Sequence, residues 1–248
     1  MIEPRKGYRF FNADCMNIMN DVPDKYFDLA VVDPEYGINE SAKGSQSRPH
    51  IARQKNGQLL KVKSNNHLQK DWDKKRPDTK YFKEIIRISK NQIIWGGNYF
   101  ADMLSHSPCW IVWNKINGNS DFADCELAWT SFKTSVRLFS FMWAGMRQGN
   151  SMNGLIMQGN KKLNEVRIHP TQKPKALYKW IYEKYCPEGA KVIDTHLGSN
   201  SNGIAAYFSK KVVEFWGIEK DKDYYRDGVN RFIKETSDMY NPAEVETI

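Results

Sequence analysis

Short apolar runs alternate along this chain with segments whose apolar residues recur at helical spacing. Residues 27–32 and 91–95 are compact, mostly apolar runs, as expected of strands that are buried on both faces of a sheet. Between them, residues 81–89 place apolar side chains at positions i, i+3 and i+4, on one side of a helix. The order strand, helix, strand predicts a parallel unit of an α/β fold.

The same two patterns predict the remaining elements of one sheet with helices on both faces. We expect further strands at residues 7–14, 109–113, 125–130, 136–139, 191–194 and 212–218. We expect helices at residues 15–20, 175–185 and 204–209, the second with Thr171 as its N-cap and Pro174 in its first turn. Residues 145–168 carry several glycines, which indicates a second variable loop. A length of 248 residues favours one domain over residues 1–248.

The sequence Asp33-Pro34-Glu35-Tyr36-Gly37 directly follows the first of these strands. Ligands of open α/β sheets bind at the carboxyl ends of strands, so this cluster is a candidate site. The Asp33 carboxylate and the Pro34 carbonyl can each accept one N–H of a planar exocyclic amine, while Tyr36 stacks on the ring. Two such acceptors would aim the nitrogen lone pair at an electrophile without a covalent intermediate. Asp-Pro is also an ordinary turn starter, and that interpretation stays open.

Composition argues against a membrane protein. Hydrophobic residues make up 40% of the chain, yet the mean hydropathy is -0.68. No run approaches the ~18 apolar residues that a membrane-spanning helix needs, and the first ten residues lack the apolar segment of a signal peptide. We therefore expect a cytoplasmic protein. The four cysteines are far apart and form no C-x-x-C pair, so neither a metal site nor a disulfide framework is indicated.

The positive charge of the chain is concentrated in one segment. The formal net charge is +8, and between residues 41 and 76 ten Lys or Arg stand against two Asp, which is also a net of +8. We call residues 38–76 the basic insertion; its Asn56-Gly57 pair is a hairpin signal. A loop that grips a polyanion is the favoured interpretation, and a solvated loop without a partner is the alternative. The candidate phosphate-contacting residues are Arg48, Arg53, Lys55, Lys61 and Lys63.

Residues 191–219 form a second candidate unit, composed of a strand, a glycine-containing loop, a helix and a strand that ends in an acid. The first strand ends at Asp194, Gly198 and Gly203 lie in the loop, and Glu219 follows 25 positions after Asp194. A nucleotide-binding βαβ unit places its ribose-binding carboxylate at about this distance. No phosphate-binding glycine motif is present, so the pattern favours an adenosine cofactor without a pyrophosphate.

Five motifs in this order make the chain resemble the DNA amino-methyltransferases that use S-adenosylmethionine. They are the Asp33–Tyr36 cluster, Gln92–Phe100, Asp121–Trp129, the H-P-T-Q-K-P sequence His169–Pro174 and the loop Asp194–Ser199. The cluster matches the D-P-P-Y motif of that family at three of four positions. Because it precedes the cofactor motif, the resemblance is to the circularly permuted members, above all the short N6-adenine methyltransferases of phages and prophages.

The resemblance implies a Rossmann-like, seven-stranded methyltransferase sheet and a role for each matching position. Asp33 and Pro34 would hold the target amine beside Glu35, and Tyr36 would stack on a base flipped out of DNA. Glu219 would take the ribose hydroxyls of the cofactor. Further cofactor-binding residues would be Asp14, Thr171, Lys173, Asp194, His196, Gly198 and Ser199.

The chain departs from the family pattern at three places. Glu35 stands where the family usually has proline, which adds a carboxylate beside the substrate amine. Asn200 replaces a usual glycine, and Asn is the non-glycine residue that best tolerates a positive φ. Thr195 and His196 replace the more widespread Pro-Phe, although Asp-Thr-His-Leu-Gly-Ser is itself a form that the phage-type proteins show.

We therefore expect an S-adenosylmethionine-dependent DNA methyltransferase that acts on adenine N6 in double-stranded DNA. Asp rather than Ser at position 33 favours adenine N6 over cytosine N4, on family analogy alone. The alternatives are a non-catalytic fold that binds DNA or cofactor, an N4-cytosine or RNA amino-methyltransferase, and methylation of a protein amine. The recognition sequence, the choice between monomer and homodimer, and a partner restriction enzyme stay open.

Overall fold

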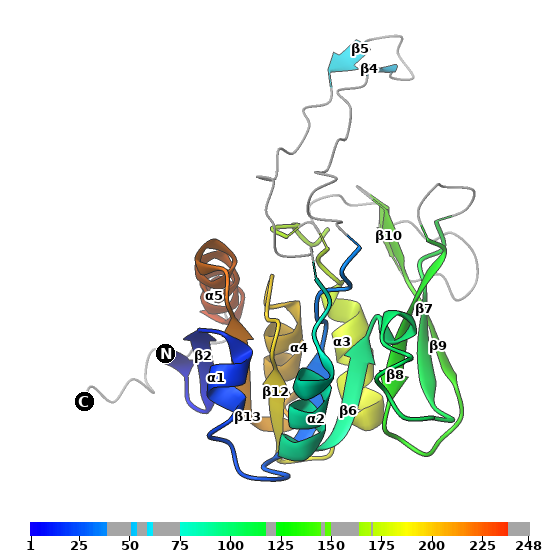
Figure 1. Ribbon diagram of the computed structural model, residues 1–248. Helices are drawn as coiled ribbons and strands as arrows, with labels where there is room; N and C mark the ends of the chain where they lie inside the picture. The colour runs from blue at the N-terminus through cyan, green and yellow to red at the C-terminus, as the bar shows by residue number, and fades with distance from the viewer. Residues whose placement is uncertain are drawn as a thin grey trace, which may run out of the picture.

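A mixed nine-stranded β-sheet forms the centre of the part of the chain that the structure describes (Figure 1). The computed structural model describes residues 1–38, 51–53, 59–61, 75–117, 123–144, 147–149, 164–169 and 171–237. Across the sheet the strands follow the order β1 (Ile2–Arg5), β2 (Tyr8–Asn12), β13 (Val212–Glu219), β12 (Ala190–Asp194), β3 (Phe27–Val32), β6 (Ser89–Trp95), β8 (Cys125–Thr130), β7 (Trp110–Asn114) and β9 (Arg137–Ser140).

The five neighbouring strands β2, β13, β12, β3 and β6 run parallel to one another. β8 is antiparallel to both β6 and β7, whereas β9 is parallel to β7 and β1 is antiparallel to β2. The seven-stranded sheet that the resemblance implies is thus the part from β2 to β7. β9, which the sequence predicts at residues 136–139, adds a strand at one edge, and β1, which it does not predict, adds one at the other.

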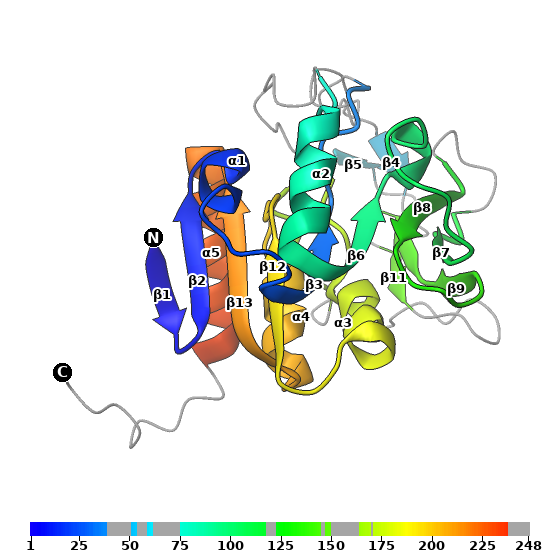
Figure 2. The ribbon, with the colours of Figure 1, turned by 60° about the horizontal axis from the view of Figure 1, so that its bottom comes forward.

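Helices cover both faces of this sheet, as predicted (Figure 2). On one face lie α1 (Cys15–Met19) and α2 (Thr79–Ile88), which bury Phe82 and Ile85 in a cluster with the sheet. On the other face lie α3 (Lys175–Tyr185), α4 (Ser201–Ser209) and α5 (Lys222–Ser237). A short 3-10 helix, η2 (Gly97–Tyr99), follows β6.

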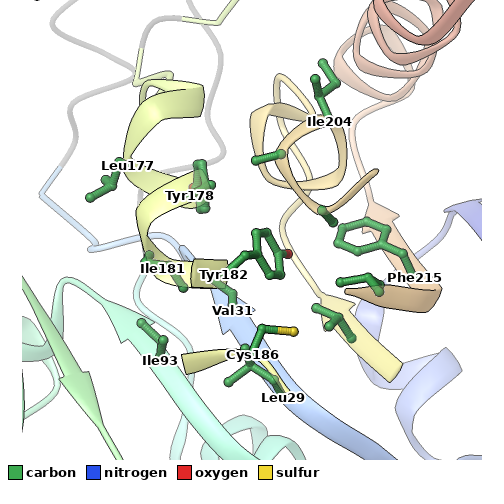
Figure 3. Packing of buried hydrophobic residues seen from close by; sticks show 14 of the residues in the cluster. Leu29, Val31, Ile93, Leu177, Tyr178, Ile181, Tyr182, Cys186, Ile204 and Phe215 are labelled. Atoms are coloured by element: carbon green, nitrogen blue, oxygen red, sulfur yellow. The ribbon is translucent and has the colours of Figure 1, made fainter. Parts of the chain in front are cut away.

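β3 is buried on both faces, as its apolar run predicts. Leu29 and Val31 belong to the cluster beneath α3 and α4 (Figure 3), whereas Ala30 and Val32 belong to the cluster beneath α2. Each large apolar side chain that is fully buried contributes about 1.5–3 kcal/mol. This packing fixes the end of β3, and with it the position of Asp33.

From the neighbouring strands β3 and β12 the chain continues in opposite directions across the sheet. From β3 it passes through α2 to β6 on one side, and from β12 it passes through α4 to β13 on the other. Because parallel crossovers are right-handed, the two helices lie on opposite faces. Ligands bind at such a switch point, outside the carboxyl ends of the two strands. Asp33 and Asp194 occupy these two ends.

Three elements were not predicted from the sequence: β1, α5 and a hairpin. The hairpin pairs β10 (Met142–Ala144) with β11 (Arg147–Gly149), so part of the predicted loop 145–168 is a strand. In the basic insertion β4 (Ile51–Arg53) pairs with β5 (Leu59–Lys61), which confirms the expected hairpin, although its turn lies outside the described residues. None of the described helices is both long and apolar enough to cross a bilayer.

The start of α3 differs from the prediction, because Thr171 is not its N-cap. The N-cap is Pro174, and the N–H of Lys175 is accepted by Glu165 Oε2 at 3.0 Å. The first N–H groups of a helix need external acceptors, and here the acceptor lies ten positions upstream. The Thr171 hydroxyl instead lies 3.2 Å from His169 Nδ1.

Gly228 allows α5 to approach the loop that follows β12, and its replacement tests that contact. A Cβ at this position would lie 2.5 Å from the carbonyl oxygen of Gly198, which is backbone and must shift. We expect Gly228→Ala to lower the free energy of unfolding by about 1–3 kcal/mol, as overpacking does. Chemical denaturation measures this change.

Asn230 supplies the control, because it is an exposed position of the same helix. Asn230→Ala should keep or slightly raise the free energy of unfolding, since alanine has the higher helix propensity. A Gly228→Ala protein as stable as the Asn230→Ala protein would contradict the proposed contact.

Candidate active site at the strand ends

A cavity of about 620 Å³ lies at the carboxyl ends of β2, β13, β12 and β3. Small-molecule sites have volumes of this order. The cavity brings together residues that are far apart in the sequence. The predicted site residues in its wall are Asp14, Asp33, Glu35, Thr171, Lys173, His196, Gly198, Ser199 and Glu219.

The other predicted residues do not form the wall of this cavity. Pro34, Tyr36 and Asp194 lie directly beside lining residues, at the ends of β3 and β12. The phosphate-contacting candidates belong to the basic insertion, and their side chains lie outside the described residues; they are Arg48, Arg53, Lys55, Lys61 and Lys63.

The Asp33 carboxylate is held by two donors. Its Oδ1 accepts the hydroxyl of Tyr36 at 2.7 Å, and its Oδ2 accepts Lys173 Nζ. The Tyr36 hydroxyl also lies 3.1 Å from the same Nζ. Burial, followed by the charge of Asp33, raises the pKa of Tyr36 well above its ordinary value, so that the tyrosine stays a donor. Asp33 is therefore oriented before any ligand arrives.

Lys173 lies against Asp33, where it also contacts a second carboxylate and an indole. Its Nζ is 3.1 Å from Glu126 Oε2 and 5.3 Å from the centroid of the Trp95 ring. The Lys173 side chain is 4% exposed. Burial alone would lower the pKa of this ammonium, but the Asp33 and Glu126 carboxylates outweigh burial and raise the pKa of Lys173 above its ordinary value. The lysine is therefore a buried cation.

Sequence analysis missed Glu126, on β8, and Lys115, which follows β7. Glu126 Oε1 lies 2.6 Å from Lys115 Nζ. Burial would raise the pKa of Glu126, but the Lys173 and Lys115 ammonium groups outweigh it and hold that pKa below its ordinary value. A single carboxylate inside the apolar strand C-E-L-A-W-T is the signal that could have marked Glu126, since buried charges need partners.

The position of the Tyr36 ring is fixed by contacts with the segment that follows β6. It stacks on Tyr99 with the ring centroids 4.9 Å apart and the planes inclined by 19°. A Cβ at Gly96 would lie 2.2 Å from Tyr36 Cε1, and Gly96 also has a φ of +69°, so this position needs glycine. Tyr99 is 38% exposed and stacks on one face of the Tyr36 ring, a contact that the sequence did not indicate.

Asp194 fixes the loop after β12 instead of facing the cavity. Its Oδ1 accepts the N–H of His196 at 3.0 Å, and its Oδ2 accepts Asn202 Nδ2 at 2.9 Å. Asn202 Nδ2 donates in addition to the carbonyl of Val31 at 3.0 Å, which ties the loop to β3. Burial raises the pKa of Asp194 to about 6.

Glu219 holds the same loop from β13 and lies in the cavity wall. Its Oε2 accepts the N–H of Gly198 at 2.9 Å, and its Oε1 accepts the N–H of Asp221 at 2.8 Å. Burial raises the pKa of Glu219. Nearby, Asp14 Oδ2 accepts Lys220 Nζ at 2.8 Å, which lowers the pKa of Asp14. Within the described part of the chain, no three His, Cys, Asp or Glu side chains gather as they do around a metal ion.

Glu35 faces the loop after β12, where it contacts a second departure from the family pattern. Glu35 Oε2 lies 3.2 Å from His196 Nε2. Burial alone would lower the pKa of His196, but Glu35 outweighs burial and raises the pKa to about 9. On its other side, His196 Nδ1 lies 2.9 Å from the hydroxyl of Thr195, which lies 2.7 Å from the Tyr81 hydroxyl. At neutral pH Glu35 and His196 form an ion pair.

Arg231 and Glu165 support the loop from the side of α5. Arg231 Nη1 donates to the carbonyl of Ser199 at 3.0 Å, and Arg231 Nη2 donates to Glu165 Oε1 at 2.7 Å. Glu165 Oε1 also accepts Gln172 Nε2 at 3.0 Å. Glu165, which lies in the predicted variable loop 145–168, thus bonds both to α5 and to the segment that carries Lys173.

Asn200 adopts the left-handed conformation that its residue type predicts, with a φ of +59°. It is fully buried, and neither its Nδ2 nor its Oδ1 has a hydrogen-bond partner among the described residues. Gly203 makes room for this amide, because a Cβ there would lie 2.2 Å from Asn200 Oδ1. The loop therefore contains a buried amide whose polar atoms form no hydrogen bond with the described residues.

The order of the strands from β2 to β7, with β8 antiparallel between β6 and β7, defines a Rossmann-like methyltransferase fold. The structure of M1.HpyAVI with SAM is similar to it, with a TM-score of 0.50, 16% identity, and coverage of 90% of this chain and 99% of the other. The PvuII DNA methyltransferase, described as cytosine-N4-specific, has a TM-score of 0.53 and 13% identity over 95% and 92% of the two chains. TTHA0409 from Thermus thermophilus, described as a putative DNA modification methylase, has a TM-score of 0.51 and 12% identity over 92% and 95%.

Residues 139–230 match the family model described as DNA methylase, of the N6 and N4 type. This stretch contains the loop after β12, Glu219 and the segment with Lys173, but not the Asp33 cluster. The match thus concerns one side of the cavity, and at the identities above the solved structures show a shared fold.

The Glu35–His196 ion pair predicts a pH dependence. Because the folded pKa of His196 lies above its ordinary 6.5, the pair contributes its full stability below about pH 6.5 and loses it as the pH rises through 9. We expect Glu35→Gln to lower the pKa of His196 by more than one unit, as measured by NMR titration. Glu183→Gln, an exposed glutamate of α3, is the control and should leave the titration of His196 unchanged. An unchanged titration in Glu35→Gln would refute the ion pair.

Asn200 provides a test of the backbone conformation of the loop. Asn200→Gly and Asn200→Ala both remove the unpaired amide, but only glycine adopts a positive φ without strain. We expect the glycine variant to be more stable than the alanine variant by about 1 kcal/mol in chemical denaturation. Equal stability of the two variants would show that the left-handed conformation is not maintained.

Proposed function

We propose that this protein transfers a methyl group from S-adenosylmethionine to an exocyclic amine of DNA, with adenine N6 as the target. The observation that carries the proposal is the shared cavity, into which both Asp33 and Glu219 open at the switch point of the sheet. An acceptor for an amine and an acceptor for ribose hydroxyls therefore border the same space. The DNA methylase match over residues 139–230 and the fold shared with M1.HpyAVI, solved with SAM, support this assignment.

The wall of the cavity fits the proposed cofactor. Each oxygen of Glu219 accepts one backbone N–H and has a further lone pair, which suits two neighbouring ribose hydroxyls. Asp14 suits an adenine amine, and Ser199 and Thr171 add hydroxyl groups. Gly198 leaves this side open, because the atom nearest to a Cβ there would be His169 Cδ2 at 3.8 Å. When bound, S-adenosylmethionine supplies a methyl group that its sulfonium makes electrophilic.

The residues of the chain supply positioning and charge for the transfer. Asp33 and the Pro34 carbonyl accept the two N–H groups of the target amine and aim its lone pair. A bond forms between nitrogen and methyl carbon while the carbon–sulfur bond breaks, its electron pair stays on sulfur, and one amine proton passes through Asp33 to solvent. The negative charge of Asp33 stabilises the nitrogen as it becomes positive. In this proposal the ring of a flipped base stacks on the Tyr36–Tyr99 pair, in which Tyr99 is the exposed ring.

The ion pair of Glu35 favours an active site over a non-catalytic relative. Glu35 replaces the usual proline of the resembled family, but His196 neutralises its charge, so the amine does not meet an uncompensated second carboxylate. The positive φ of Asn200 likewise supports a loop of unchanged shape. Cytosine N4 is the second candidate target, because its amine presents the same two N–H groups and the cytosine-N4-specific PvuII enzyme shares the fold.

DNA would be held by the basic insertion 38–76, whose net charge between residues 41 and 76 is +8. We assign phosphate contacts there to the basic candidates Arg48, Arg53, Lys55, Lys61 and Lys63. Arg76, at the end of this segment, pairs with Asp102 at 2.6 Å and donates to the Tyr99 carbonyl at 2.8 Å. These contacts hold Arg76, the last residue of the insertion, beside Tyr99. In this proposal residues 1–248 act as one permuted domain, and residues 145–168 add specificity.

The experiment is transfer of radiolabelled methyl from S-adenosylmethionine to unmethylated genomic DNA, followed by nucleoside digestion to identify the product. We expect labelled N6-methyladenine, and a rate about 10²–10³-fold lower for Asp33→Ala, as when an electrostatic contact to the transition state is removed. Asp227→Ala, a partly exposed aspartate of α5, is the matched control and should keep the wild-type rate.

The product decides between the candidates. Labelled N4-methylcytosine would move the target to cytosine. Cofactor binding without label in DNA would refute methyl transfer to DNA. Stronger competition by RNA than by duplex DNA would show that RNA, and not DNA, is the substrate.

A further inference from the structure

Glu126 is a partly buried carboxylate, 24% exposed, to which the proposed transfer assigns no role. One oxygen, Oε1, pairs with Lys115 Nζ at 2.6 Å. The other, Oε2, is buried and lies 3.1 Å from Lys173 Nζ, yet it makes no aligned hydrogen bond in the described structure. The same Nζ donates directly to Asp33 Oδ2. The Lys173 ammonium thus has one acceptor that it uses and a second one within reach.

The bond between Lys173 and Asp33 conflicts with the task of that carboxylate. Asp33 Oδ1 already accepts the Tyr36 hydroxyl, and Oδ2 accepts the ammonium, so a target amine must compete with both donors. A bound ammonium also offsets the negative charge that would stabilise the reacting nitrogen. Because a buried ammonium without a partner is costly, Lys173 can leave Asp33 only for another negative group.

We propose that Glu126 provides a second position for the Lys173 ammonium, so that Asp33 is released toward the target amine. Glu126 is then a positioning residue, which acts through Lys173, and the inference rests on the proposed methyl transfer. The shift is short, because both carboxylates already flank the same nitrogen. The rings of Trp95 and Tyr36 lie 5.3 and 5.6 Å from it, and aromatic faces attract a cation.

The charges around this group favour such a shift. The groups that face Lys173 are the Asp33 and Glu126 carboxylates, the Tyr36 hydroxyl and, through Glu126, the Lys115 ammonium. Two carboxylates and two ammonium groups make a neutral cluster. Moving Nζ from one carboxylate to the other leaves the number of charges unchanged, so no new charge has to be buried.

The backbone beside Lys115 keeps Glu126 in place. The N–H of Lys115 donates to the carbonyl of Asp124 at 2.9 Å, and the N–H of Ile116 donates to Asn114 Oδ1 at 3.0 Å. Ile116 has a φ of +49°, a left-handed conformation that is rare for a β-branched residue. Such strain persists only where surrounding contacts determine it, which agrees with a corner that must hold Lys115 against Glu126.

The first test replaces Glu126 by glutamine, which keeps the shape but removes the charge. We expect Glu126→Gln to lower kcat about 10- to 100-fold, the effect of a misplaced catalytic group, with the Kd for S-adenosylmethionine changed less than about threefold in calorimetry. Glu214→Gln is the matched control, because Glu214 is also a largely buried strand glutamate that contacts a lysine. An unchanged kcat in Glu126→Gln would overturn the proposal.

A double-mutant cycle tests whether Glu126 acts through Lys173. If it does, Glu126→Gln should cost nothing further once Lys173→Met has removed the ammonium, so the double variant should match the Lys173→Met variant in kcat. A further loss of about 10-fold in the double variant would assign Glu126 a separate role and overturn the proposal.

A readout without turnover separates this inference from the proposed function. The ammonium signal of Lys173 in ¹⁵N-lysine NMR reports its titration, and loss of Glu126 removes one of the two carboxylates that raise its pKa. We expect a lower pKa of Lys173 in Glu126→Gln than in the wild type; identical titration curves would refute the second position. If the wild-type protein methylated no substrate, the proposed function would be refuted. The titration would still show whether Glu126 interacts with Lys173.

A conservative variant covers the case in which Glu126→Gln does not fold. Glu126→Asp keeps the charge but withdraws it by one methylene, so kcat should lie between those of the wild type and an uncharged variant. A kcat of Glu126→Asp equal to that of the wild type would show that the position of the carboxylate does not matter.

Discussion

Burial of the Lys173 ammonium is the constraint on which the rest of the site depends. An ammonium removed from water needs negative partners, and the fold supplies Asp33 from the end of β3 and Glu126 from β8. These two strands lie on either side of β6, whose Trp95 ring flanks the same nitrogen. The lysine therefore connects the proposed catalytic carboxylate to the part of the sheet that contains the antiparallel strand. Asp33 reaches its orientation through this contact and through Tyr36.

A second ion pair connects the two halves of the cavity. Glu35 comes from the segment after β3 and His196 from the loop after β12, and both are departures from the pattern of the resembled family. Their contact matches a carboxylate with an imidazolium, so neither charge lacks a partner of opposite sign. The pair spans the switch point, where Asn202 also links the two strands through its bonds to Asp194 and to the carbonyl of Val31.

Local patterns explain what could be predicted from the sequence. The buried strands, the helices α2 and α3 and the left-handed Asn200 follow from period, residue type and position. Contacts between distant residues could not be read in this way: Lys173 meets Asp33 across 140 positions, and Glu126, although it lies in the motif Asp121–Trp129, has no sequence feature that indicates Lys173 as its partner. The cap of α3 was misassigned for the same reason. Thr171 is a residue type that often caps a helix, but the carboxylate that accepts the N–H of Lys175 belongs to Glu165. α5 was not predicted because its buried face includes Gly228 and Arg231, which interrupt the pattern of apolar residues at helical spacing.

The two sides of the site share one support, which lies outside every motif. Glu165 caps the start of α3, two residues after Lys173, and Arg231 binds both Glu165 and the carbonyl of Ser199. Displacement of Arg231 would therefore move the segment that carries the ammonium together with the loop after β12. Since Arg231 lies on α5, packing of this helix determines the geometry of both sides at once. Arg231 is buried on a helix whose other buried residues are uncharged, and its charge is balanced by Glu165 and Glu235.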